Sequence, residues 1–211
     1  LKIMTTTPPS EELADLSPYI DIYCPVSYDY DAEAWNAAKD DGKEMWMYAC
    51  VGPRAPYPNS HTYNRLYEIR VLYWQVWHYD LHGFLYWSTT PYYHGNYGWG
   101  FNAWGDAWYL YEEEDGSVDE TIRWENWRDA TDDYEYIWLM NATIAATGGN
   151  PEEYALHQSY VSTIVGDYYE YCDSYEDVLS VRSKIGDWLS DKNSLPSVNT
   201  TSIGETDWNP P

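Results

Sequence analysis

Apolar and polar positions alternate in short blocks along the first ninety residues. Apolar runs that end in turn residues predict four strands, at 2–6, 20–26, 44–51 and 83–89. Between the second and third runs, the sequence DAEAWNAAKDD predicts a helix over 31–41, with Asp31 as its N-cap and Gly42 just past its end. The pattern is therefore one of strands separated by helices.

The longest periodic segment predicts a helix over 61–80. Its apolar residues recur at i, i+3, i+7, i+10 and i+11 and form one stripe, made of Leu66, Ile69, Tyr73, Val76 and Trp77. Further helices are predicted at 119–146, 151–171 and 175–190, before an extended polar tail. The connection 90–116 is rich in Trp, Tyr, Gly and Asn, and so long a connection in a compact domain is usually functional.

These elements predict an α/β fold. Strands separated by helices pair in parallel through right-handed crossovers. Four strands cannot close an eight-stranded barrel, yet a parallel sheet needs both faces covered. We therefore expect residues 1–118 to form the second half of a (β/α)8 TIM-type barrel, with 90–116 as a site loop, residues 119–191 to form C-terminal helices packed on it, and 192–211 to form a tail. The first half of the barrel is expected in cis or from another chain.

Charge narrows the classes of partner. The chain carries 35 acidic and 11 basic residues, for a net charge of −24, so neither nucleic acid nor an anionic membrane is an expected partner. No apolar run reaches the roughly 18 residues that a membrane span needs. Scarce lysine and abundant acid suit strong salt, where charge repulsion is screened. A salt-loving source and an ordinary acidic secreted protein both stay open, and we expect an extracellular or cell-surface location. Whether the sequons at Asn141 and Asn199 carry glycan is open.

The sequence predicts neither a metal nor another cofactor. Its three cysteines, Cys24, Cys50 and Cys172, show no zinc spacing and are too few for a disulfide framework, although one bridge between Cys24 and Cys50 stays open. There is no P-loop, no G-x-G-x-x-G after a strand and no H-E-x-x-H. These absences argue against a nucleotide-dependent or metal-dependent enzyme.

Three ordered stretches resemble one known family. They are MWMYACVGPRAPYPN (45–59), EIRVLYWQVWHYDLHGFLYWS (68–88) and RWENWRDATDDYEYIWLM (123–140). The stretches resemble the domain-of-unknown-function family 4091, which overlaps the catalytic domain of glycoside hydrolase family 123, the β-N-acetylgalactosaminidases. The resemblance covers about two thirds of the chain. The family's glycine–aspartate–glycine turn reads Gly105-Asp106-Ala107 here, which departs from the pattern.

The resemblance implies substrate-assisted hydrolysis. The acetamido oxygen of the sugar attacks the anomeric carbon, while one carboxyl group orients the acetamido group and another protonates the leaving oxygen. The family's adjacent aspartate–glutamate pair lies at the end of an earlier barrel strand, so we expect it upstream of this chain. Here the Asp-Glu dipeptide, Asp119-Glu120, falls at a predicted helix start, where acidic residues serve as caps. No residue of the chain is assigned a catalytic role.

Candidate substrate-binding residues follow the predicted strands. A barrel carries its site at the C-terminal ends of its strands, and sugars present flat apolar faces edged by hydroxyls, which suit Trp and Tyr. The candidates are Tyr28, Tyr57, Asn59, Trp87, Ser88, Tyr92, Trp99, Asn102 and Asp106, with Tyr93 and Trp104 beside them in the loop. Packing alone is the alternative for each aromatic residue, and it is the expected role of Trp74 and Trp77. The charged residues Arg70, Arg123, Glu125, Arg128 and Asp129 are expected to form ion pairs that anchor helices.

Two functions fit the sequence. One is a fragment or subunit of a glycoside hydrolase-like protein that acts on N-acetylhexosaminides, with carbohydrate as its partner. The alternative is a non-catalytic carbohydrate-binding or extracellular structural protein, such as a filament or coat, built on the same scaffold.

Overall fold

The computed structural model describes residues 1–90 and 104–192 and has an α/β fold. Four strands form one parallel sheet in the order β1-β2-β3-β4, so β1 and β4 are its outer strands. The strands are β1 (Met4–Thr5), β2 (Ile22–Tyr23), β3 (Glu44–Ala49) and β4 (Gly83–Tyr86). The predicted parallel sheet is confirmed, and its strands are shorter than the apolar runs from which they were predicted.

Helices cover one face of this sheet. Helix α1 (Ala32–Asp40) follows β2, and Asp31 caps it by accepting a 3.0 Å hydrogen bond from the Ala34 amide, as predicted. Helix α2 (Leu66–His78) follows β3. Short 3-10 turns at Glu11–Leu13, Ser17–Tyr19 and Ser27–Asp29 complete the connections.

Strand β3 shows how the sheet faces differ. Its Met45 and Met47 side chains are fully buried and pack in one cluster with Leu72 of α2. The alternate residues Trp46 and Tyr48 point to the other face and are only partly buried. Successive side chains of a strand point to opposite faces, so within the described residues the second face carries no helix layer.

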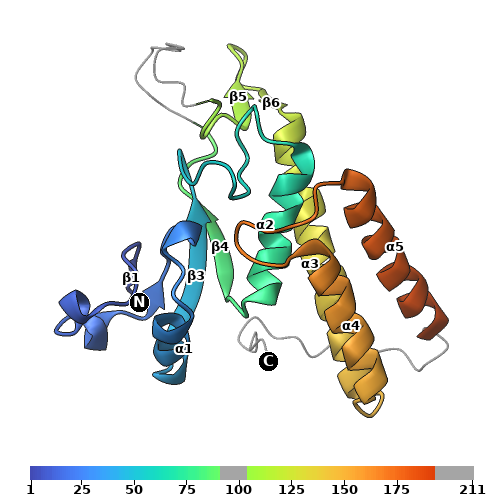
Figure 1. Cartoon of the computed structure of the whole chain (residues 1–211). Helices are drawn as coiled ribbons and strands as arrows, with labels where there is room; N and C mark the ends of the chain where they lie inside the picture. The colour runs from blue at the N-terminus through green and yellow to red at the C-terminus, as the bar shows by residue number, and fades with distance from the viewer. Residues whose placement is uncertain (91–103, 193–211) are drawn as a thin grey trace.

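A second hydrophobic core lies on the side of α2 that faces away from the sheet. Helices α3 (Ile122–Ala146), α4 (Pro151–Ile164) and α5 (Tyr175–Lys192) pack there, as Figure 1 shows. Ile137, Met140 and Ile144 of α3 are fully buried within this core. Trp74 and Trp77 of α2 also pack into it, which confirms their expected role.

Three predicted helix boundaries are wrong. Residues 61–65 are a loop, because the Glu68 carboxylate accepts a 2.9 Å hydrogen bond from the Arg65 amide and the helix begins after it. Strands β5 (Leu110–Glu112) and β6 (Val118–Glu120) form a hairpin where a loop and a helix start were expected. The dipeptide Asp119-Glu120 is therefore in a strand, and α3 begins after Thr121, whose hydroxyl accepts a hydrogen bond from the Trp124 amide.

The third wrong boundary concerns α4, which ends at Ile164 and not near 171. Val165 and Tyr171 pair as an isolated antiparallel bridge, so the chain turns back on itself between α4 and α5. The Cys172 amide donates a 2.9 Å hydrogen bond to the Ile164 carbonyl and closes the turn. This turn, 165–172, lies beside α2 in Figure 1.

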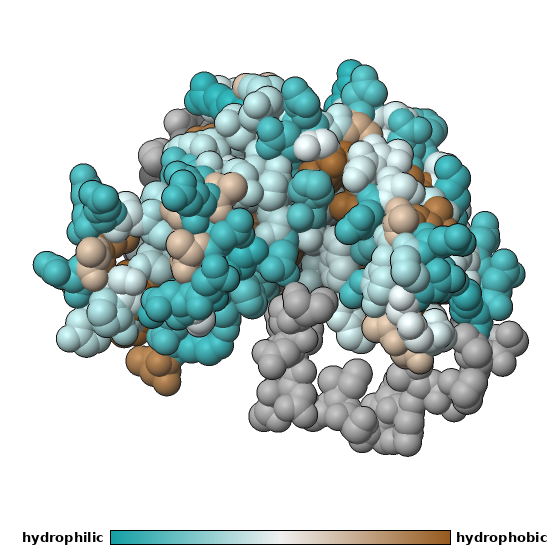
Figure 2. Space-filling view, turned by 60° about the horizontal axis from the view of Figure 1, so that its bottom comes forward, coloured by the Kyte–Doolittle hydropathy of each residue, from teal (hydrophilic) through white to brown (hydrophobic). Residues whose placement is uncertain are grey.

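The surface agrees with the acidic composition. Figure 2 views the molecule from the end that is at the bottom of Figure 1, and hydrophilic residues dominate that face, with hydrophobic residues in small separate groups. Among the helices of residues 1–90 and 104–192, none combines the length and apolar character that a membrane span requires.

Candidate functional site

The loop after β3 is fixed by a buried amide. The Asn59 side chain donates to the Cys50 carbonyl at 3.1 Å and to the Pro53 carbonyl at 2.8 Å, and it accepts from the Ser60 amide at 2.8 Å. Asn59 is fully buried, so its side chain cannot contact a sugar. The predicted substrate-binding role of Asn59 is corrected here to a positioning role, because all of its polar atoms bind the loop.

His61 continues this support and was not singled out from the sequence. Its Nε2 lies 2.9 Å from the Cys50 carbonyl oxygen, and its Nδ1 lies 3.0 Å from the Tyr63 hydroxyl. Because a carbonyl oxygen can only accept, Nε2 carries the proton and the Tyr63 hydroxyl donates to Nδ1. Burial lowers the pKa of His61, while the charge of Asp106 opposes that shift. The His61 imidazole that supports the loop after β3 is therefore neutral. Its proximity to Asp106 arises from the tertiary fold, and no pattern in the sequence predicts it.

The end of β4 meets the turn around Asp106. Oδ1 of Asp106 accepts hydrogen bonds from the Tyr86 hydroxyl at 2.6 Å and from the Trp87 indole nitrogen at 2.8 Å. The Trp87 side chain is 45% exposed, although its polar edge is held. Ser88 lies next to it and donates to the Thr90 carbonyl at 3.2 Å. The structure thus brings together Trp87, Ser88 and Asp106, three of the predicted residues.

A tight turn places Asp106. Gly105 and Ala107 have φ values of 79° and 64°, in the left-handed region. A Cβ on Gly105 would lie 2.6 Å from Cγ2 of Thr62, so this position needs glycine. Arg123 from the first turn of α3 donates to the Ser60 and Gly105 carbonyls at 2.8 Å each. The turn around Asp106 is therefore held by glycine geometry at Gly105 and by the guanidinium of Arg123.

Trp104 and Arg54 extend the site toward the loop after β3. The guanidinium carbon of Arg54 lies 4.2 Å from the centroid of the Trp104 ring, within the range of a cation–π contact. The Tyr63 ring meets the same indole edge-on, with centroids 5.8 Å apart. Trp104 is 42% exposed. Together these contacts connect the turn around Asp106 with the loop after β3.

A second aromatic group lies on the other side of that loop. Tyr28 follows β2 and is 52% exposed, and its ring meets Tyr57 with centroids 6.5 Å apart. Tyr57 in turn meets Tyr169 from the turn between α4 and α5, at 5.8 Å. The structure brings the predicted residues Tyr28 and Tyr57 together and adds Tyr169. The candidates Tyr92, Tyr93, Trp99 and Asn102 lie outside the described residues.

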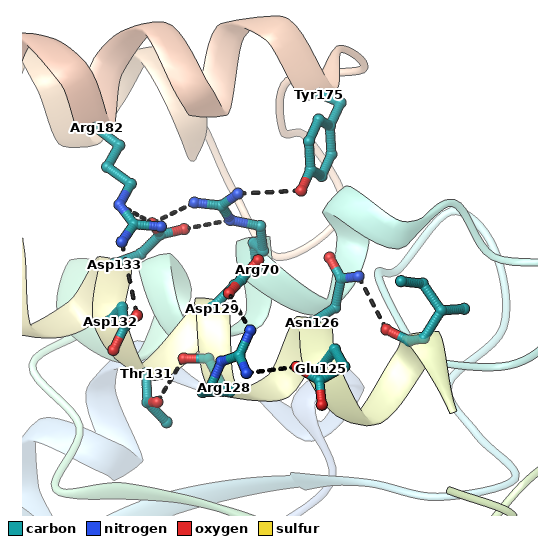
Figure 3. A network of polar contacts seen from close by, with 11 residues as sticks. Arg70, Glu125, Asn126, Arg128, Asp129, Thr131, Asp132, Asp133, Tyr175 and Arg182 are labelled. Atoms are coloured by element: carbon teal, nitrogen blue, oxygen red, sulfur yellow. Dashed lines mark hydrogen bonds and ion pairs between the residues drawn. The ribbon is translucent and has the colours of Figure 1, made fainter. Parts of the chain in front are cut away.

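Buried charge anchors the helices behind the site (Figure 3). Nε and Nη2 of Arg70 donate to the two oxygens of Asp133 at 2.6 and 2.5 Å, and both side chains are buried. Arg182 of α5 reaches the same carboxylate at 3.6 Å. Burial raises the pKa of Asp133, and the charge of Arg70 opposes that shift. The anchoring role of Arg70 is confirmed, but neither Asp133 nor Arg182 was expected from the sequence.

The other expected ion pairs have mixed outcomes. Arg128 pairs with Glu125 at 2.5 Å and with Asp129 at 3.5 Å on an exposed face of α3, as Figure 3 shows. Arg123 instead binds carbonyl oxygens, with 2.5 Å to that of Trp108. Within residues 1–90 and 104–192 the expected ion pair of Arg123 does not form, and its guanidinium instead donates hydrogen bonds that join two loops.

The cysteines and acidic residues form no metal centre in the part of the chain that the structure describes. Cys24, Cys50 and Cys172 are free thiols, so the bridge left open between Cys24 and Cys50 is absent. Burial raises the pKa of Cys24 to about 12, which makes it an unreactive packing residue.

Comparison with known proteins adds family evidence to this geometry. The family model of the glycoside hydrolase 123 catalytic domain matches residues 3–140, about two thirds of the chain. The chain belongs to the glycoside hydrolase 123 catalytic domain family. The match includes all four parallel strands and Asp106 and ends within α3, so α4 and α5 lie beyond it. The resemblance to family 4091 stays a prediction.

A solved family 123 glycoside hydrolase from Clostridium perfringens, described in a structural analysis of glycolipid glycan hydrolysis, shares the fold of this glycoside hydrolase 123 domain. The TM-score is 0.61 at 17% identity, and the similarity covers 92% of this chain and 36% of that chain. This chain therefore spans just over a third of the length of that neighbour. No curated protein sequence matches the chain.

Proposed function

We propose that this glycoside hydrolase 123 domain binds N-acetylhexosaminides at Trp87 and Asp106 and takes part in their substrate-assisted hydrolysis. One observation carries the proposal. A half-exposed tryptophan stands at the C-terminal end of a parallel strand, and its indole edge is fixed by a carboxylate. In barrels this end of the strands carries the site, and the family membership supplies the reaction class.

The arrangement suits a sugar for physical reasons. The exposed indole offers a flat apolar surface to the C–H face of a pyranose ring. Within residues 1–90 and 104–192, Oδ2 of Asp106 accepts no hydrogen bond, so it can accept one from a sugar hydroxyl. Bonds to an ionised acceptor are the stronger kind. Tyr86 and Trp87 already hold the carboxylate in place. Sugar binding therefore costs little conformational entropy at the Asp106 side chain.

The chemistry needs two further carboxyl groups. In substrate-assisted hydrolysis the acetamido oxygen forms a bond to the anomeric carbon as the bond to the leaving oxygen breaks, and an acid gives that oxygen a proton. Water then opens the cyclic intermediate and restores the acetamido group. We assign neither carboxyl group to the described residues, since Asp119 and Glu120 lie on an exposed hairpin strand. The pair is proposed to come from polypeptide outside this sequence.

The sheet supports that arrangement. Both outer strands, β1 and β4, have an unpaired edge within the described residues, and Trp46 and Tyr48 lie on the face without helices. A pocket of about 530 Å³ runs between β4 and α3, with Phe84, Tyr86 and Trp127 among its lining residues. We propose that the first half of a (β/α)8 barrel covers these surfaces and carries the carboxyl pair.

A chromogenic β-N-acetylgalactosaminide tests the proposal when it is incubated with the intact protein that contains this sequence. Release of the chromophore supports hydrolysis. Sugar binding without turnover favours instead the non-catalytic carbohydrate-binding protein. If the protein neither binds nor cleaves the sugar, the proposed function is wrong.

A further inference from the structure

The turn between α4 and α5 is held by its own hydrogen bonds and lies beyond the family match. The amides of Gly166 and Asp167 both donate to the Glu170 carbonyl, at 2.8 and 2.7 Å. Val165 and Tyr171 pair across the base of the turn. The turn therefore has its own hydrogen-bonded frame, and its tip holds Tyr168 and Tyr169.

Tyr168 fixes this turn to the barrel helices. Its side chain is buried and stacks on Tyr79 with ring centroids 3.9 Å apart and an interplanar angle of 11°. Gln75 of α2 donates from Nε2 to the Tyr168 carbonyl at 3.0 Å. The Tyr79 hydroxyl donates to Asp167 at 2.9 Å. With Tyr168 held inward by these contacts, Tyr169 is turned outward and is 47% exposed.

Tyr169 completes a row of three tyrosines, which we call the tyrosine strip. The row runs from Tyr28 to Tyr57 and on to Tyr169, with centroid distances of 6.5 and 5.8 Å and edge-on contacts. Tyr28 and Tyr57 follow β2 and β3, so the strip begins at the C-terminal edge of the sheet. The loop that carries Tyr57 also carries Arg54, which contacts Trp104. One loop therefore contacts both the strip, through Tyr57, and the turn that carries Asp106, through Arg54 and Trp104.

The chemistry of the strip favours uncharged sugars. Tyrosine rings offer an apolar surface and a hydroxyl at its edge. The carboxylates of Asp167 and Glu170 raise the pKa of the Tyr169 phenol, so its hydroxyl stays protonated at neutral pH. The same carboxylates repel anionic groups such as sulfate or sialic acid. An extended neutral glycan is the ligand that matches both the aromatic surface and the charge.

We infer that the tyrosine strip binds the distal neutral sugars of a glycan whose terminal N-acetylhexosamine occupies the Trp87–Asp106 site. The inference rests on the proposed function and adds to it a preference for extended substrates. Tyr169 is the residue that sets this preference, since it is exposed, prepositioned and supplied by a segment beyond the family match.

Calorimetric titration of the intact protein separates the two sites. The probes are methyl β-N-acetylgalactosaminide and a neutral tetrasaccharide that ends in the same sugar through a sulfur linkage, which resists hydrolysis. For Tyr169→Ala we expect tetrasaccharide affinity to fall about tenfold, or about 1.4 kcal/mol, through loss of a stacking contact, while monosaccharide affinity is unchanged. The matched control is Tyr19→Ala, an exposed tyrosine at a 3-10 turn remote from the strip, which should change neither affinity.

The outcomes distinguish the inference from the function on which it rests. Unchanged tetrasaccharide affinity in Tyr169→Ala, with monosaccharide binding intact, overturns the inference alone. Equal losses for both probes also overturn it, since they would place Tyr169 in support of the terminal-sugar site. If the unaltered protein binds neither probe, the proposed function fails and the inference with it.

Discussion

The indole nitrogen of Trp87 donates a 2.8 Å hydrogen bond to Oδ1 of Asp106 and so joins the end of β4 to a turn 19 residues further along the chain. The Tyr86 hydroxyl donates to the same oxygen. Tyr86, the last residue of β4, and Trp87, which follows it, thereby share one acceptor. Protein donors hold one oxygen of this carboxylate, while its other oxygen accepts no hydrogen bond from the described residues, which is the arrangement a preformed polar contact requires.

Asp106→Ala should weaken the binding of methyl β-N-acetylgalactosaminide by tenfold or more. It removes an ionised acceptor whose hydrogen bonds are worth roughly 1.5–3 kcal/mol, and it frees the indole edge of Trp87. Asp106→Asn is the matched control, because its carbonyl oxygen can still accept from Tyr86 and Trp87, and it should lose less affinity. Calorimetry measures both variants. An Asp106→Ala affinity equal to that of the unaltered protein would remove Asp106 from the site.

The turn around Asp106 offers a test of stability. Ala107 has a φ of 64° and is fully buried, and L-residues other than glycine pay roughly 1–2 kcal/mol in this region. Ala107→Gly should therefore stabilise the protein, by about 1 kcal/mol after the entropy that glycine adds to the unfolded chain. Urea unfolding measures the change. Marked destabilisation would show that the methyl group of Ala107 contributes more by packing than it costs in strain.

How far the sequence predicts this fold depends on the kind of signal. The parallel sheet, α1 and α2 follow from apolar runs and a capped amphipathic segment. Helix α3 is different. Its buried positions fall at alternating spacings of three and four, but three of the first four, Arg123, Asn126 and Asp133, are polar or charged. Hydrophobic periodicity cannot reveal a stripe whose first half is polar, since each buried polar group depends on a partner elsewhere in the chain.

The candidate site was predictable only in part, for a similar reason. That Trp87 and Asp106 lie together could be expected, because strand ends and a family turn mark them, and their sugar-binding role stays a prediction. Asn59 was misassigned, since an exposed amide and one that holds a buried loop look identical in sequence. His61 was missed because its contacts with Cys50 and Trp104 are tertiary, and Tyr169 because its neighbour Tyr57 comes from a distant segment. The hairpin β5–β6 was missed because its strands are short and lie within a dense acidic run.

The Arg70–Asp133 pair should behave as a buried ion pair. Asp133→Ala leaves the Arg70 guanidinium without its main partner in a dry environment, so the free energy of unfolding should fall by about 3–5 kcal/mol. The double variant Arg70→Met, Asp133→Leu should cost much less, because it removes both charges. Arg128→Ala, at an exposed pair, is the control and should cost no more than about 1 kcal/mol. Urea unfolding that shows the double variant to be as unstable as Asp133→Ala would contradict this account.

His157 should make stability depend on pH below neutrality. The imidazole is buried, with Nε2 3.2 Å from the Ile137 carbonyl, and burial lowers its pKa. The unfolded chain therefore binds a proton near pH 6.5 that the folded protein takes up only at lower pH. The contribution of neutral His157 to the free energy of unfolding is therefore fully present above about pH 6.5, and it is lost as the pH falls from there.

His157→Gln isolates this contribution, because the amide can still donate to the Ile137 carbonyl without titrating. Thermal unfolding at pH 7.5 and 5.5 should show a smaller decrease for the variant, by at most about 1.4 kcal/mol per pH unit. Equal decreases in the two proteins would mean that His157 titrates alike in both states.

The most direct test of the account observes Trp87 itself. Indole N–H resonances of the ¹⁵N-labelled protein can be followed during titration with methyl β-N-acetylgalactosaminide, with the Trp87 signal identified from its absence in Trp87→Phe. We predict that this resonance shifts and saturates at millimolar sugar, on the order of 1–10 mM, while that of the buried Trp74 does not move. A Trp87 resonance that stays fixed throughout the titration would contradict the assignment of a sugar site to Trp87 and Asp106.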